Sequence, residues 1–202
     1  PHHDLNMKKK YIREKVLIQD SFKLAIKIFN SEFKPDFLVG LWRGGSTVGI
    51  YVQECLQHLG VQTDHISIRT SYQGEPDYQE RIKRGREIRV HGLQYLLENL
   101  NHDQKLLIVD DVYGSGSSIN AVIKQLSERL KKNMPSNYKV AVPWYKPSKN
   151  TSGRVPDFYV HETDEWLVLP YELLGLDPNE IANNKPGVSE ILSSISVNYN
   201  LD

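Results

Sequence analysis

The chain has 202 residues, and its 25 basic and 25 acidic side chains give a formal net charge of zero. That length suits one main domain with a small accessory element, and the charge balance provides no electrostatic attraction for nucleic acid or for an anionic membrane. No apolar stretch approaches the roughly 20 residues that a membrane-spanning helix needs.

Residues 1–12 are expected to form an N-terminal extension. They lack the apolar core of a signal peptide, and the paired His2 and His3 favour a non-native leader ahead of a natural start at Met7. The single cysteine, Cys55, lies in an apolar helical pattern, which predicts a buried structural thiol. This cysteine content favours a reducing, cytoplasmic setting.

Helical and extended patterns alternate along the rest of the chain. Residues 13–30 carry apolar side chains at helical spacing, a second helix follows the turn at 42–46, and a third begins near residue 118. The predicted strands comprise residues 37–41, 65–68, 106–109, 138–142, 156–161 and 166–169. Residues 69–89 are polar and contain glycine and proline, which is typical of a long functional loop.

This alternation predicts an α/β fold with a central parallel sheet flanked by helices. The core is expected to span residues 13–155, followed by a small hood at 156–176 and a loosely packed extension at 177–202. Ligands of such sheets bind beyond the carboxyl ends of the strands. Two glycine-containing turns follow predicted strands, so both are expected to face the same crevice.

The most informative segment comprises residues 106–118. A buried strand ends in Asp110 and Asp111, a turn of glycine and serine follows, and a helix then begins. Free N–H groups at the helix start, together with close backbone approach at the glycines, suit a phosphate group. Carboxylates need hydroxyls or a cation instead, so the predicted ligand carries a sugar as well as a phosphate.

This segment resembles the phosphoribosyl pyrophosphate loop of type I phosphoribosyltransferases. The resemblance implies that Asp110 and Asp111 bind the 2′- and 3′-hydroxyls of the ribose. It also implies that amides and hydroxyls of the following turn hold the 5′-phosphate, which assigns this role to Tyr113, Gly114, Ser115, Gly116, Ser117 and Ser118.

The turn after the first strand is similar to the pyrophosphate loop of the same family. Its residues are Trp42, Arg43, Gly44 and Gly45. The similarity implies that backbone amides and the Arg43 side chain hold the pyrophosphate, and that the Trp42–Arg43 peptide bond is cis.

Ser71 and Tyr72 open the predicted loop and resemble the 6-oxopurine branch of the family, in which this loop closes over the pyrophosphate and excludes water. The loop also contains the basic residues Arg81, Lys83, Arg84 and Arg86. Through this resemblance the expected catalytic residues are Asp110, Asp111, Arg43, Ser71 and Tyr72.

A later pair of motifs is similar to bacterial xanthine–guanine phosphoribosyltransferases and their archaeal hypoxanthine relatives. The resemblance implies that Lys146, in a Lys-Pro pair, donates to the purine O6 and that Trp166 stacks on the ring. It further implies that the Leu167 backbone reads the base edge and that Glu172 lies near C2 or a second Mg²⁺.

One position departs from the family pattern. The 6-oxopurine enzymes usually place an aspartate three residues after the second acid of the loop, where it handles the N7 proton of the base. Gly114 occupies that position here.

The resemblance as a whole implies Mg²⁺-dependent transfer of phosphoribose from phosphoribosyl pyrophosphate to hypoxanthine, guanine or xanthine, by a homodimer. Asp110 and Asp111 are expected to reach the metal indirectly, through ribose or water. Two alternatives remain open: a phosphoribosyltransferase with a different acceptor, and a non-catalytic nucleotide-binding regulator on the same fold.

Overall fold

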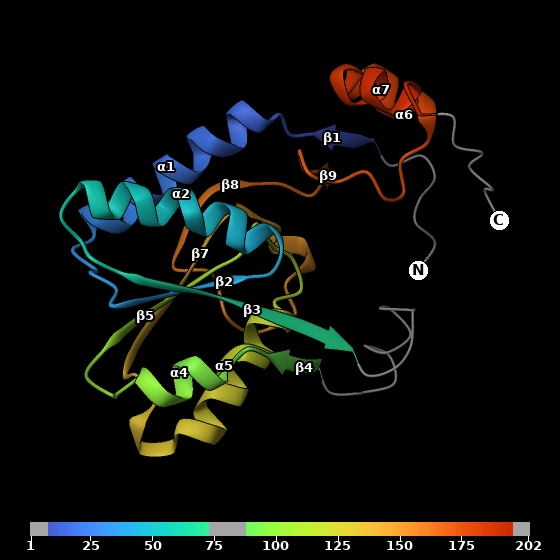
Figure 1. Ribbon diagram of the computed structural model, residues 1–202. Helices are drawn as coiled ribbons and strands as arrows, with labels where there is room; N and C mark the ends of the chain where they lie inside the picture. The colour runs from blue at the N-terminus through green and yellow to red at the C-terminus, as the bar shows by residue number, and fades with distance from the viewer. Residues whose placement is uncertain (1–7, 73–87, 196–202) are drawn as a thin grey trace. The chain divides into compact units, whose positions relative to one another are not determined.

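The computed structural model describes residues 8–72 and 88–195 (Figure 1). The chain forms two compact units. The larger comprises residues 15–164, and the smaller combines the chain up to residue 14 with the chain from residue 165 onward. Within the described residues, no helix is both long enough and apolar enough to cross a bilayer.

The larger unit contains a seven-stranded sheet in the order β4-β3-β2-β5-β7-β6, with β8 paired to β7. Only the pairing of β3 with β4 is antiparallel, so the predicted α/β fold with a mostly parallel central sheet is confirmed. The strands are β2 (Phe37–Leu41), β3 (Asp64–Tyr72), β4 (Ile88–His91), β5 (Lys105–Val109), β6 (Val112–Tyr113), β7 (Asn137–Tyr145) and β8 (Phe158–Glu162).

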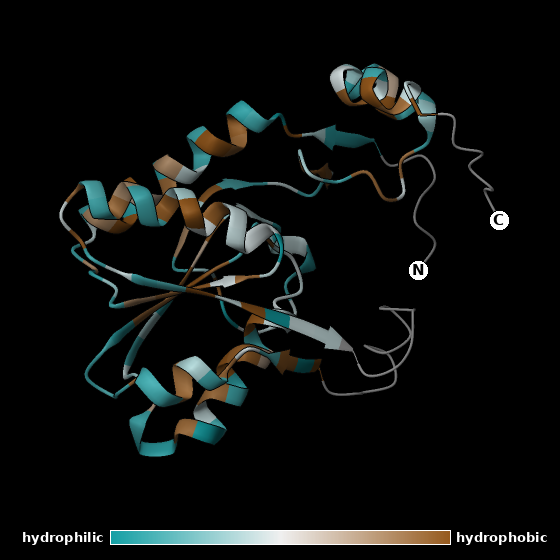
Figure 2. Ribbon diagram, in the orientation of Figure 1, coloured by the Kyte–Doolittle hydropathy of each residue, from teal (hydrophilic) through white to brown (hydrophobic). Residues whose placement is uncertain are grey.

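The central strands are nearly continuous apolar runs because both of their faces are covered. All five residues of β2 are buried, as are the last four of β5, and Figure 2 shows these central strands as hydrophobic. In the parallel register Gly40 is paired with Val109. The carboxyl ends of β2 and β5 therefore lie side by side, and so do the turns that follow them.

Helices cover both faces of this sheet (Figure 1). The helices α1 (Glu14–Asn30) and α2 (Gly44–His58) cover one face, while α4 (Gln94–Asn99) and α5 (Ser117–Leu130) cover the other. Apolar residues at helical spacing, among them Leu17, Leu24 and Ile28, form the buried side of α1. Short 3₁₀ helices occupy Lys131–Asn133 and Pro147–Lys149.

One buried carboxyl group connects α1 to the sheet. Asp20 is only 2% exposed, and its Oδ1 lies 3.0 Å from Nε2 of His161 on β8. The His161 ring stacks on Trp144 of β7, with a centroid distance of 4.4 Å. A buried carboxylate needs such a partner because its desolvation is costly.

Several predicted elements have different boundaries in the structure. The strand β3 continues to Tyr72 and pairs with β4 from Ile88, so regular structure replaces both ends of the predicted loop at 69–89. Arg81, Lys83, Arg84 and Arg86 lie outside the described residues. The helix α4 had no predicted counterpart. Cys55 on α2 is half-buried, and burial raises the pKa of its thiol.

The smaller unit joins the two ends of the chain. The strand β1 (Lys9–Tyr11) pairs in parallel with β9 (Trp166–Val168), and two helices follow, α6 (Pro178–Asn184) and α7 (Pro186–Ser193). Regular structure therefore occurs in both segments that were predicted as extensions. The predicted hood at 156–176 is divided between the units, because β8 belongs to the large sheet whereas β9 pairs with β1.

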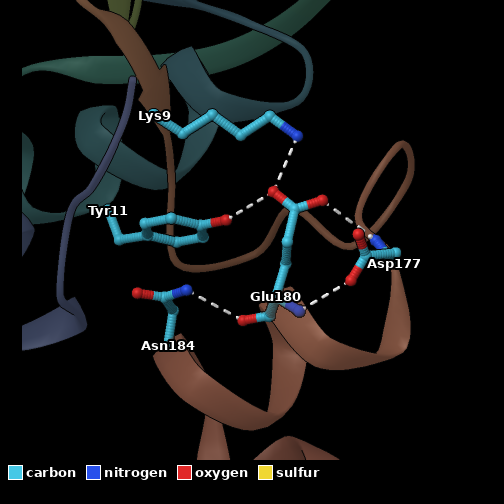
Figure 3. Close-up of polar contacts among 5 residues, drawn as sticks. All are labelled: Lys9, Tyr11, Asp177, Glu180 and Asn184. Atoms are coloured by element: carbon cyan, nitrogen blue, oxygen red, sulfur yellow. Dashed lines mark hydrogen bonds and ion pairs between the residues drawn. The ribbon is translucent and has the colours of Figure 1, made fainter. Parts of the chain in front are cut away.

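Glu180 connects β1 to α6 within the smaller unit (Figure 3). Its Oε2 accepts hydrogen bonds from Lys9 Nζ at 2.8 Å and from the Tyr11 hydroxyl at 2.9 Å. Its Oε1 accepts from the backbone N–H of Asp177, whose side chain accepts in turn from the Glu180 N–H. This reciprocal capping box starts α6. We call Lys9, Tyr11 and Glu180 the terminal clasp.

The hydrogen bonds of the terminal clasp shift two pKa values. The bond from Lys9, followed by those from the Asp177 N–H and Tyr11, lowers the pKa of Glu180 from 4.5 to about 2. Burial, together with the bond to Glu180, raises the pKa of Tyr11 from 10.0 to about 12. The ionised Glu180 is thus favoured in the folded unit, which makes its contribution to stability complete above pH 4.5 and lost as the pH falls through about 2.

Replacing Glu180 by glutamine is expected to loosen the smaller unit at neutral pH. Hydrogen exchange of the β1 amides and of the adjacent Ile12 amide, which donates to the Val168 carbonyl, is expected to accelerate several-fold at pH 6. As the pH falls below about 2, wild type and variant are expected to converge, because protonation of Glu180 removes the same charge. Glu190→Gln on α7 is the matched control. Equal exchange in all three proteins at pH 6 would contradict a stabilising clasp.

Candidate functional site

Two of the predicted anion-binding turns touch at the carboxyl edge of the large sheet. A Cβ atom added to Gly45 would lie 2.4 Å from the Val109 carbonyl oxygen and 3.0 Å from Cα of Asp110. Real Cβ atoms do not approach backbone this closely, so only glycine fits. The turn after β2 therefore packs directly on the point where β5 ends in its acidic pair.

The turn from Trp42 to Gly45 has the geometry that the sequence predicted. The Trp42–Arg43 peptide bond is cis, and the Trp42 N–H donates to the Ile68 carbonyl of β3 at 2.7 Å. The Trp42 side chain is 61% exposed. Arg43 immediately precedes α2, so its side chain and the first amides of that helix belong to the same turn.

Asp110 and Asp111 are anchored by the backbone that follows them. Asp110 Oδ1 accepts from the Asp111 N–H at 2.8 Å, and Asp111 Oδ1 accepts from the Val112 N–H at 2.7 Å. Asp110 keeps some contact with solvent but is densely surrounded by protein. This desolvation, reinforced by the neighbouring Asp111 charge, raises the pKa of Asp110 well above its ordinary value of 3.8.

The predicted 5′-phosphate turn leads into α5. Gly116 precedes the helix in a left-handed conformation, with φ of 81°. The Ser117 N–H donates to Ser115 Oγ at 3.2 Å, and the Ser115 hydroxyl donates to Ser117 Oγ at 2.9 Å. Ser118 Oγ accepts from the Thr70 hydroxyl of β3 at 3.3 Å, which connects the turn to the strand that carries Ser71.

Two residues of this turn differ in what they offer a ligand. The Tyr113 side chain is 1% exposed, and its hydroxyl is engaged by Ser152 and the Arg154 carbonyl. Its expected contribution to phosphate binding is thus limited to the backbone. Gly114, in contrast, borders open space, because an added Cβ there would meet no atom within 4 Å.

Ser71 and Tyr72 form the end of β3, next to the same edge. The Ser71 hydroxyl lies 2.7 Å from Nε2 of His91 on β4, and Tyr72 is paired with Ile88. His91 and Thr70 are neighbours of the site that sequence reasoning did not single out. The antiparallel β3–β4 pair, which the sequence does not signal, brings His91 to this position.

The predicted base-binding residues are distributed over the two units. Lys146 follows β7 in the larger unit, and its N–H donates to the Tyr113 carbonyl at 2.9 Å. Trp166 and Leu167 lie on β9 of the smaller unit, where the Lys9 ammonium covers one face of the Trp166 ring at 4.7 Å from the centroid. Glu172 belongs to this smaller unit too. Stacking of a base on Trp166 stays a prediction.

The raised pKa of Asp110 has a consequence for stability. Its folded state holds the proton more tightly than the unfolded state, so stability decreases as the pH rises above 3.8 toward the folded pKa. Asp110→Asn is therefore expected to raise the melting temperature at pH 7, by about 2–4 °C for each kcal/mol recovered. The gain is expected to disappear near pH 3.8.

The matched control is Asp103→Asn, which removes the same charge at an exposed loop position. Thermal unfolding of the three proteins between pH 4 and 8 gives the comparison. A melting temperature for Asp110→Asn below that of the control at pH 7 would contradict a desolvated, charge-strained carboxylate.

Comparisons with known proteins agree with this geometry. The structure is similar to that of a purine phosphoribosyltransferase from Pyrococcus horikoshii, with 27% identity, a TM-score of 0.63, and coverage of 85% of this chain and 98% of that one. A hypothetical protein from Neisseria gonorrhoeae with bound ppGpp gives 20% identity and a TM-score of 0.66, covering 90% and 98% of the two chains.

A xanthine-guanine-hypoxanthine phosphoribosyltransferase from Helicobacter pylori shares the fold at 18% identity, with a TM-score of 0.59 and coverage of 82% and 95% of the two chains. No curated protein sequence matches the chain significantly. The family model of the phosphoribosyl transferase domain, however, matches residues 10–173, well over half of the chain. The two turns predicted to bind anions meet beside the acidic pair, in agreement with this match, and the chain belongs to the phosphoribosyl transferase domain family.

Proposed function

We propose that the protein is a purine phosphoribosyltransferase that transfers phosphoribose from phosphoribosyl pyrophosphate to a 6-oxopurine base. The observation that carries the proposal is the packing of Gly45 against Val109 and Asp110, which joins a pyrophosphate-type turn to a ribose-phosphate turn. The similarity to the purine enzyme from Pyrococcus horikoshii supports the choice of acceptor.

In this proposal the protein acts mainly by positioning and by charge. Arg43 and the amides of its turn hold the departing pyrophosphate, while the start of α5 holds the 5′-phosphate. Asp110 and Asp111 bind the ribose hydroxyls and support the positive charge that develops on the ribose as the bond to pyrophosphate breaks. Lys146 donates to the base oxygen. The base nitrogen forms the new bond to the ribose carbon as the bond to pyrophosphate breaks, and the proton of that nitrogen is released to solvent or to the departing pyrophosphate.

The residues present fit a requirement for Mg²⁺. This ion prefers oxygen ligands and keeps several waters. Among the described residues, no group of three or more His, Cys, Asp or Glu could hold a metal by itself. Phosphate and ribose oxygens of the donor would therefore supply most of the ligands of the ion. Asp110 and Asp111 would assist through ribose hydroxyls or water. When bound, Mg²⁺ neutralises charge on the leaving pyrophosphate. Binding of a second Mg²⁺ near Glu172 is part of the same proposal.

An assay with four bases tests the proposal. The purified chain is incubated with phosphoribosyl pyrophosphate, Mg²⁺ and hypoxanthine, guanine, xanthine or adenine, and both products are quantified by chromatography. Nucleoside monophosphate and pyrophosphate are expected in equal amounts from at least one 6-oxopurine. If all three are inert while the donor binds, a different acceptor is favoured. Tight binding of a nucleoside monophosphate without any turnover would favour a regulator.

Lys146→Ala is expected to lower kcat/KM for the 6-oxopurine by about 10- to 100-fold, the loss of one charge-assisted hydrogen bond. The KM for the donor is expected to change less than about twofold, because Lys146 is assigned to the base. Lys149→Ala, an exposed lysine of the same segment, serves as control. Equal effects of the two substitutions would remove Lys146 from the base site.

Gly114→Asp tests the departure from the family pattern. The position has open space and no left-handed φ, so an aspartate fits without strain. General acid–base groups typically contribute about 10²–10⁴-fold to rates, and restoring one is expected to raise kcat for hypoxanthine at least about tenfold. Gly114→Asn is the isosteric control without an acid. An equal rise in both variants, or in neither, would show that proton transfer does not limit the wild-type enzyme.

A further inference from the structure

A polar cluster lies behind the predicted 5′-phosphate turn and has no role in the mechanism above. It consists of the Tyr113 hydroxyl, the side chains of Asn150 and Ser152, and the Arg154 backbone; we call it the phosphate-loop brace. We propose that Ser152 and Asn150 are positioning residues that hold this turn in its phosphate-binding shape and connect it to Lys146. The inference rests on the proposed function and deepens it.

The Ser152 hydroxyl is saturated within the brace. Its Oγ lies 2.6 Å from Asn150 Oδ1 and 3.0 Å from the Arg154 carbonyl oxygen. Both atoms only accept, so the single proton of the hydroxyl is donated to one of them, and Asn150 Oδ1 is the nearer. The Tyr113 hydroxyl lies 2.7 Å from the same Oγ and 3.0 Å from the Arg154 carbonyl oxygen, so its own proton is donated to one of these two atoms. The Arg154 N–H donates to the Ser152 Oγ at 3.1 Å. Four polar groups of the brace thus surround this single oxygen atom.

The Asn150 amide is used just as completely. Its Oδ1 accepts from both the N–H and the hydroxyl of Ser152, at 2.9 and 2.6 Å. Its Nδ2 donates to the Arg154 carbonyl at 2.8 Å and to the Tyr145 hydroxyl at 2.9 Å. Only an amide supplies two acceptor and two donor positions on one short side chain. An aspartate would keep the acceptors and lose both donors.

The brace is in direct contact with the phosphate turn. A Cβ on Gly116 would lie 2.6 Å from Ser152 Cβ and 2.6 Å from the Tyr113 hydroxyl oxygen, so the brace fills the space behind that residue. The Thr151 N–H donates to the Ser115 carbonyl at 3.2 Å, and Asn120 of α5 donates to the Ser152 carbonyl at 3.3 Å. Both sides of the left-handed Gly116 are therefore held by the same short segment.

The brace also leads to the base-reading lysine. The Lys146 N–H donates to the Tyr113 carbonyl, and the 3₁₀ turn Pro147–Lys149 joins Lys146 to Asn150, whose N–H donates to the Pro147 carbonyl at 3.2 Å. A continuous hydrogen-bonded path connects the phosphate turn to Lys146. The pyrophosphate turn lies on a different pair of elements, β2 and α2, and has no part in this path.

This separation gives a selective test with two small probes, ribose 5-phosphate and magnesium pyrophosphate, titrated calorimetrically into the full chain. Ser152→Ala is expected to raise the Kd of ribose 5-phosphate about tenfold, the scale of one lost hydrogen bond, and to leave the Kd of pyrophosphate within about twofold. KM for phosphoribosyl pyrophosphate is expected to rise more than kcat falls. Ser148→Ala is the matched control, since its hydroxyl bonds to Asp164 and not to the turn.

A second pair of variants keeps the inference testable if Ser152→Ala folds poorly. Asn150→Asp is expected to show the same selective loss. Tyr113→Phe removes the hydroxyl that meets Ser152, and the double variant Tyr113→Phe/Ser152→Ala is expected to lose little more than the worse single variant, because both remove one shared interaction. Additive losses would contradict the brace.

Failure of the inference is distinguishable from failure of the proposed function. If the wild-type chain binds ribose 5-phosphate and Ser152→Ala behaves like Ser148→Ala, the positioning role is wrong. Equal weakening of both probes would likewise overturn it, because that pattern indicates general destabilisation. If the wild-type chain binds neither probe and makes no nucleotide, the proposed function is wrong, and the inference falls with it.

Discussion

The contact of Gly45 with the end of β5 sets the spacing of the candidate site. No side chain fits between this residue and the Val109 carbonyl, so the backbone of the predicted pyrophosphate turn packs directly on the end of the strand that precedes Asp110. The parallel pairing of β2 with β5 fixes the position of one strand end relative to the other. The two turns predicted to bind anions are thereby in contact, and their separation is set by the sheet rather than by flexible side chains.

The acidic pair introduces a conflict into this rigid frame. Asp110 is partly desolvated by the surrounding protein, and the neighbouring Asp111 repels its charge, although a carboxylate is most stable when solvated or paired. The fold therefore tolerates an unfavourable charge at the strand end. Such local conflict is common where a residue is retained for ligand binding rather than for stability. A ligand that brings hydroxyls or a cation would relieve it.

Local sequence patterns predicted the core strands and helices of the larger unit well, and they predicted the pairing of the two ends of the chain poorly. Residues 37–41 match β2 in both bounds, and the prediction for 13–30 misses the start of α1 by one residue, because continuous burial and helical spacing are local signals. The strand β1 has no such signal. Its partner β9 comes from the opposite end of the chain, and three residues are too few to show a period.

The residues of the candidate site show the same difference between local and long-range signals. The acidic pair and both glycine turns were predicted because each is a contiguous segment with its own chemistry. The brace was not, since Asn150 and Ser152 occur in a polar stretch that looks like an ordinary turn, and only the fold brings Tyr113 to them. Lys146 and Trp166 were predicted individually, but they belong to separate compact units.

The pairing of β1 with β9 has a consequence for the order in which the protein forms during synthesis. The first described strand to leave the ribosome has no partner until residues 166–168 have been made, whereas the strands of the large sheet can pair earlier. The turns that we propose for the donor can therefore assemble in a nascent chain that lacks Trp166 and Leu167. Under the proposed function, recognition of the acceptor is completed last, and a stalled or truncated product would retain the proposed donor turns without it.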